Sequence, residues 1–196
     1  LAATAFLAVV GAIDDMRTLG VLPRLLSQMV AVLCVIAVLP SDVRVAPFAP
    51  AWAERAFLFV AMLWFVNLTN FMDGLDWMTV AEFVPLTLGL TILGLLRALP
   101  TEGIIVALAL CGALIGFASF NKPVARLFLG DVGSLPIGLL VAWLLVLLAG
   151  HGHLAAAIIM PLYYIADATI TLGRRIANRE PFWLSHRSHF YQRATD

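Results

Sequence analysis

The sequence predicts an all-α fold, a polytopic helix bundle embedded in a membrane. Of its 196 residues, 62% are hydrophobic and only 12% are charged, and the mean hydropathy of +0.99 is far above that of soluble domains. Several apolar runs approach the roughly 17 to 25 residues that a helix needs to cross a bilayer. The strand-like alternation typical of a membrane barrel is absent. We therefore expect one integral membrane domain over residues 1–196.

Seven hydrophobic segments give about seven expected transmembrane helices. In chain order they cover residues 1–13, 23–40, 53–71, 79–98, 103–120, 135–150 and 154–173. The first begins at Leu1 without an initiator Met, and the chain stops soon after a polar block. We therefore expect a fragment that is truncated at both ends.

Basic residues predict the orientation of these helices. Seven crossings place the connections 14–22, 72–78, 121–134 and 174–196 on one side of the membrane and 41–52, 99–102 and 151–153 on the other. Nine of the twelve Lys and Arg residues fall on the first side, which is therefore predicted to be cytoplasmic. The net charge of zero gives no reason to expect a nucleic-acid partner.

The first cytoplasmic block places Asp14 and Asp15 side by side at the end of a helix. The next helix begins with Arg24 and Gln28, which are four residues apart and so share a face. Adjacent carboxylates repel each other unless a cation or a proton compensates their charge. The pair therefore indicates either a divalent metal site or proton transfer.

The second block spaces Asn67, Asn70, Asp73 and Asp76 three residues apart. On a continuous helix they would drift around one face, whereas a break at Gly74 would put the aspartates on a turn, still close together. Both arrangements stay open. Asn and Asp side chains together suit a hard cation and sugar hydroxyls.

The third block surrounds a single carboxylate with small residues. Asp131 lies between Gly130 and Gly133, downstream of Asn121 and two basic residues. Glycines let backbone amides approach a phosphate closely, and a carboxylate can hold Mg²⁺ whose other ligands come from substrate phosphates. We expect Asp131 to be the metal ligand.

The fourth block carries His186, Arg187 and His189 after a span that ends in Arg174 and Arg175. Arginines at a helix end are ordinarily topological anchors. The two histidines, three residues apart, would share one side of a helix, and imidazole and guanidinium groups both suit phosphate. Taken alone, this block would be read as a solvated amphipathic segment.

Together the four blocks resemble a known family. GAIDD with Arg24 and Gln28, NFMDGLD, FNKPVARLFLGDVGS and HRSHFYQR are similar, in this order, to the cytoplasmic signatures of the polyprenyl-phosphate N-acetylhexosamine-1-phosphate transferases, glycosyltransferase family 4. The last block looks more like the branch of undecaprenyl-phosphate GlcNAc-1-phosphate transferases that initiate O-antigen and other surface polysaccharides than like the peptidoglycan enzymes.

The resemblance implies an enzyme of the bacterial inner membrane with its active site facing the cytoplasm. It would transfer a sugar 1-phosphate from a UDP-N-acetylhexosamine to undecaprenyl phosphate and release UMP, using Mg²⁺ or, as an alternative, Mn²⁺. A homodimer is a further expectation. Asp14, Asp15, Asp73 and Asp131 would be catalytic, with Asp131 on the metal. The substrate-binding set would be Asn70, Asp76, Asn121, Arg24, His186, Arg187 and His189.

One departure and three rival functions accompany this expectation. The family usually has glycine where this chain has Trp77, so we expect a bulky ring beside the sugar or uracil site. A transporter would use Glu82 and Asp167 inside the membrane as an ion path, but the polar groups gather at one interface. A catalytically inactive scaffold that recruits other glycan enzymes would not need the aspartates of the cytoplasmic blocks. An intramembrane aspartyl protease would need glycine where Phe128 stands.

Overall fold

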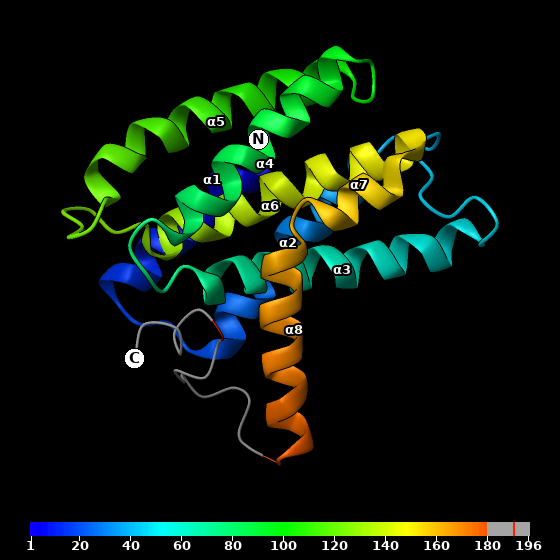
Figure 1. Cartoon of the computed structure of the whole chain (residues 1–196). Helices are drawn as coiled ribbons and strands as arrows, with labels where there is room; N and C mark the ends of the chain where they lie inside the picture. Colours follow the sequence, from blue (N-terminus) through cyan, green and yellow to red (C-terminus); the bar gives the residue numbers. More distant parts are fainter. Residues whose placement is uncertain (180–189, 191–196) are drawn as a thin grey trace.

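The computed structural model describes residues 1–179 and Phe190, and the ordered elements of this part are all helices (Figure 1). The predicted sites His186, Arg187 and His189 lie outside the described residues. In chain order the helices are α1 (Ala2–Met16), α2 (Val21–Val38), α3 (Ala51–Met72), α4 (Met78–Leu95), α5 (Thr101–Asn121), α6 (Gly130–Leu148), the π-helical turn η1 (Ala149–His153), α7 (Leu154–Ile159) and α8 (Leu162–Ala177).

The predicted membrane helix bundle is confirmed. Among the described residues, five helical stretches are long and apolar enough to cross a bilayer, namely α2, α3, α4, α5 and the stretch Gly130–Ile159. The first and last helices are shorter, with 15 residues in α1 and 16 in α8.

The last predicted span, 154–173, is not one helix. It divides at Pro161 into α7 and α8, and Figure 1 shows α8 leaving α7 at a steep angle. Proline lacks the N–H group that a continuous helix needs, and its ring clashes with the preceding turn. The chain reverses between α6 and α7 at His151 and Gly152, whose φ of 89° is left-handed, so this turn matches the predicted connection 151–153.

The core is organised around α6, most of whose residues are buried. It packs mainly against α1 and α3. Glycines permit this close approach. A Cβ on Gly11 of α1 would clash with the main-chain carbonyl of Asp131, and one on Gly138 of α6 would lie 3.0 Å from Val66 Cα on α3. The packing therefore brings the start of α6, where Asp131 lies, to the ends of α1 and α3.

Candidate functional site

Polar side chains from four helices meet around the start of α6. The Nη1 atom of Arg24 lies 3.2 Å from Asp14 Oδ2 and 3.4 Å from Asp131 Oδ2. From α3, the Asn70 amide donates to Asp131 Oδ1 over 2.6 Å and to Ser134 Oγ over 2.9 Å. Both oxygens of Asp131 therefore face donors from other helices, and this fixes the orientation of its carboxylate.

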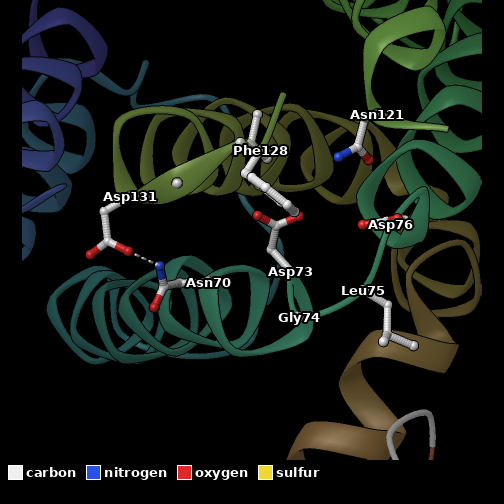
Figure 2. A pocket seen from close by; sticks show the side chains of 10 residues that line it. Asn70, Asp73, Gly74, Leu75, Asp76, Asn121, Phe128 and Asp131 are labelled. Carbon is white, nitrogen blue, oxygen red and sulfur yellow. Dashed lines mark hydrogen bonds between the residues drawn. The ribbon is translucent and has the colours of Figure 1, made fainter. Parts of the chain in front are cut away.

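Beside this cluster lies a pocket with a volume of about 310 Å³. Figure 2 shows Asp73 at the end of α3 and Asp131 at the start of α6, with Phe128 above Asp73. The lining residues come from the end of α3 and the loop after it, from the end of α5, and from the segment that leads into and begins α6: Asn70, Asp73, Gly74, Leu75, Asp76, Asn121, Phe128, Leu129, Gly130 and Asp131. The predicted polar blocks two and three thus form one cavity.

Asp73 is the most perturbed carboxyl group at this pocket. Burial raises the pKa of Asp73 to about 6, the Thr79 hydroxyl opposes this shift by donating to Oδ1, and the neighbouring charge of Asp131 raises the pKa further. Helix α3 ends at Met72, so Asp73 begins the turn that leads to α4. Of the two arrangements left open for this block, the break near Gly74 is therefore the one observed.

The adjacent aspartates of α1 have different partners. Asp14 Oδ1 accepts from the Leu19 amide over 2.5 Å, and its Oδ2 pairs with Arg24. Asp15 accepts from the amides of Asp131 and Val132, both over 3.0 Å, so it caps the N-terminus of α6 from another helix. The catalytic assignment of both residues stays a prediction, while the contacts give Asp15 a positioning role.

Asp76 and Asn121 hold the two pocket loops together. Asn121 is buried, accepts from the Trp77 amide over 2.8 Å and donates to the Leu127 carbonyl over 2.9 Å. Asp76 Oδ2 accepts from the Ala125 amide over 2.9 Å. These two predicted substrate-binding residues therefore line the pocket, whereas Arg24 does not, and each of the two already has polar contacts within the pocket walls.

Trp77 does not line the pocket. Its φ of 66° lies in the left-handed region that glycine tolerates best, and its indole Nε1 donates to the Ala118 carbonyl of α5 over 2.9 Å. The bulky ring is therefore directed towards α5. The left-handed backbone and the indole bond keep this side chain out of the pocket lining, and the expectation of a bulky ring beside the sugar or uracil site stays a prediction.

Three further polar residues that the sequence indicated lie between the helices, away from the pocket. Gln28 is buried and accepts from the Asn67 amide over 2.7 Å, so both serve an interhelical contact. Glu82 Oε1 is buried without a hydrogen-bond partner among the described residues. None of these three side chains lines the pocket.

Sequence reasoning missed two residues of the site. Phe128 lines the pocket with 73% of its surface exposed, although an aromatic residue three positions before Asp131 could have signalled a stacking platform. Thr79 binds Asp73 through its hydroxyl. No pattern in the sequence distinguishes this threonine from the others on α4.

The donor set fits a hard cation that is partly coordinated by substrate. No three His, Cys, Asp or Glu side chains within the described part of the chain converge to enclose a metal ion. Asp73 and Asp131, however, face one pocket, and the charge of Asp131 disfavours ionisation of Asp73. Mg²⁺ characteristically takes one or two carboxylates and completes its shell with water and phosphate oxygens.

Comparison with known proteins gives consistent matches. The family model described as glycosyl transferase family 4 matches residues 1–149. The chain is 28% identical over 197 residues to a probable undecaprenyl-phosphate N-acetylglucosaminyl 1-phosphate transferase of Bacillus subtilis, covering 94% of this chain and 54% of that protein. It is 30% identical over 145 residues to the phospho-N-acetylmuramoyl-pentapeptide-transferase of Lacticaseibacillus paracasei, covering 72% and 44%. The chain thus spans about half the length of these curated relatives.

Proposed function

Because this chain belongs to glycosyl transferase family 4, we propose that it carries the active site for transfer of N-acetylhexosamine 1-phosphate from a UDP-sugar to undecaprenyl phosphate, with release of UMP. The resemblance to this family is confirmed, and the matched residues 1–149 include the first three sequence blocks. The observation that carries the proposal is the fixed carboxylate of Asp131 beside Asp73 in a pocket at the helix ends.

Asp131 is the residue that would hold Mg²⁺, with Asp73 as the second carboxylate facing the same space. A bound Mg²⁺ would neutralise phosphate charge and orient the diphosphate of the donor. Asn70 and Arg24 keep the Asp131 carboxylate in place. Asp14 in turn holds Arg24, whose guanidinium would also attract an anionic substrate.

Asp73 is our choice for the proton acceptor. A phosphate monoester has a second pKa of about 6, and burial raises the pKa of Asp73 to about 6 as well. In the absence of a bound metal, a proton on the acceptor phosphate would therefore pass to Asp73 at little cost. Asp15 would act indirectly, because both its oxygens bind amides of α6.

The nucleotide would lie against Phe128 and the loop after α3. An exposed aromatic ring at a pocket offers a stacking surface for a flat base, an interaction worth roughly 1–3 kcal/mol in single-strand nucleic-acid binding proteins. Figure 2 shows this ring close to Asp73 at the pocket. Asp76 and Asn121 would support the nucleotide site by fixing its walls.

The proposal also includes the membrane location, the pathway step and the oligomeric state. The excess of basic residues on the connections that carry the site supports a cytoplasmic active site in the bacterial inner membrane. Initiation of O-antigen or another envelope polysaccharide would be the pathway step, and the homodimer stays a prediction. A transporter explains the pocket less well. Transporters bind their substrates near the centre of the bilayer, whereas the polar groups of this pocket lie at helix ends.

The test uses the full-length protein in detergent with undecaprenyl phosphate, Mg²⁺ and a panel of labelled UDP-hexosamines that includes UDP-GlcNAc. We expect lipid-linked label and UMP, and Asp131→Asn should lower the rate by at least about 100-fold because it removes the fixed charge that would hold the metal. Asp42→Asn is the matched control, since Asp42 is exposed in the connection after α2. The proposal fails if no sugar gives product and Asp131→Asn changes nothing.

A further inference from the structure

We infer that Thr79 is a positioning residue that fixes the Asp73 carboxylate in the pocket. Asp73 caps the C-terminal end of α3, and Thr79 lies in the first turn of α4, across the short loop that joins the two helices. The Thr79 hydroxyl donates to Asp73 Oδ1, and Thr79 is 1% exposed. The inference rests on the proposed function, because it assigns Thr79 a role in the reaction that Asp73 serves.

The other buried threonines of this region use their hydroxyls differently. Thr69 on α3 donates to the Phe65 carbonyl over 2.9 Å, and Thr87 on α4 donates to the Phe83 carbonyl over 2.6 Å. Such bonds to the preceding turn of the same helix are the common local pattern for threonine. Thr79 lies in the first turn of its helix and binds a side chain outside that helix, so its hydroxyl serves a contact at the pocket.

This contact leaves one oxygen of Asp73 available. Oδ1 accepts from Thr79, whereas no donor among the described residues binds Oδ2. The carboxylate faces the pocket in Figure 2, and Asp131 is the acidic side chain of the cavity wall that affects it electrostatically. A carboxylate at a helix end can rotate, and a hydrogen bond to one of its oxygens restricts this rotation. The second oxygen is then presented to a ligand in one orientation.

The experiment compares Thr79→Val with Thr79→Ser in the full-length protein. Valine keeps the shape of threonine and removes the hydroxyl, so we expect kcat to fall about 10- to 100-fold with little change in KM for the UDP-sugar. Serine keeps the hydroxyl and should restore most of the activity. Thr87→Val is the matched control, because within the described part of the chain that hydroxyl bonds only to carbonyls of its own helix, and its kcat should equal that of wild type.

Two results would overturn the inference. Either Thr79→Val retains the wild-type kcat, or Thr79→Ser is as slow as Thr79→Val while both proteins melt at the wild-type temperature. If wild type itself transfers no sugar, the proposed function fails, and the contact is then judged by a double-mutant cycle of Thr79→Val and Asp73→Ala on the melting temperature. If the changes in melting temperature of the two single variants add up to that of the double variant, the contact is refuted. If they do not add up, the two residues are coupled and the contact is supported.

Discussion

Neighbouring acidic residues of this site perform different tasks because their side chains point to different helices. Asp14 holds Arg24, Asp15 caps α6, and Asp73 keeps one oxygen towards the pocket. A carboxylate whose oxygens are both occupied by donors is poorly suited to accept a further proton. The contacts therefore favour Asp73 over the adjacent pair as the reacting group.

Asp73 should destabilise the folded protein at neutral pH. Its pKa is raised from 3.8 to about 6 by burial, so the folded state binds its proton more tightly than the unfolded state. The resulting loss of folding free energy is absent below pH 3.8 and reaches about 3 kcal/mol above the raised pKa. Asp73→Asn should therefore melt at a higher temperature than wild type at about pH 8 in detergent with EDTA, and this difference should disappear near pH 4.

Added Mg²⁺ provides the control for this prediction. A cation held between Asp73 and Asp131 would compensate the charge of wild type but not that of the variant, so Mg²⁺ should reduce the difference at about pH 8. Asp42→Asn, at an exposed carboxylate, should show no such dependence on pH. Equal melting temperatures for wild type and Asp73→Asn under the alkaline condition would contradict the buried-charge explanation.

At the level of elements, the junction of α1 with α6 determines where Asp131 lies. Asp15 caps α6 from α1, and Gly130 enters the helix with a φ of 63°, where a Cβ would lie 2.5 Å from Asp15 Oδ2. A Cβ on Gly11 would clash with the main chain of Asp131, so α1 and α6 approach each other closely at this glycine. The start of α6 is thus held by a second helix as well as by its own hydrogen bonds.

Gly11→Ala should separate α1 from α6. The added methyl group would clash with the Asp131 carbonyl, and overpacking of this kind costs typically about 1–3 kcal/mol. We expect a lower melting temperature and a loss of transferase activity, because Asp131 moves with the backbone. Gly112→Ala on α5 is the matched control, since no described residue outside the backbone of its own helix has an atom within 4 Å of the position that its methyl group would take. A fully active Gly11→Ala would show that the junction is more tolerant than its geometry indicates.

Most helix boundaries were predictable from hydropathy to within a few residues. The end of α1 and the division between α7 and α8 were not, because they depend on backbone hydrogen bonding. Asp14 and Asp15 lie in the last turn of α1, although the predicted span ended at residue 13. The predicted span 154–173 contains Pro161, whose missing N–H divides it. The apolar composition of a segment predicts whether it prefers the membrane, but it does not predict where the backbone hydrogen bonds of a helix are interrupted.

At the scale of the whole molecule, the predicted site is built at one end of the bundle. The ends of α1 and α3 and the start of α6 meet there, and the loops on either side of the pocket are joined by Asn121. The connection after α2 is held separately by buried Glu54, which pairs with Arg44 and accepts from two loop amides. Two polar regions therefore lie in different connections of the chain.

Cysteine labelling can determine the sides of these connections. In a background with Cys34 and Cys111 replaced by serine, Phe48→Cys and Val124→Cys place thiols at positions that are 92% and 91% exposed. With intact spheroplasts, an impermeant maleimide should label position 48 directly and position 124 only after permeabilisation, because the basic connections are expected in the cytoplasm. The reverse labelling pattern would refute the proposed orientation.

Composition and the order of residues along the chain are enough to predict a helical membrane protein whose polar residues gather in a few blocks between helices and share a family pattern. These properties depend on neighbours in the sequence. The packing of the helices, in contrast, settles that Asp15 caps α6 and that Asn121 joins two loops. The bond from Asp15 joins residues 116 positions apart, and the direction of a side chain over such a separation depends on helix packing that no local pattern encodes.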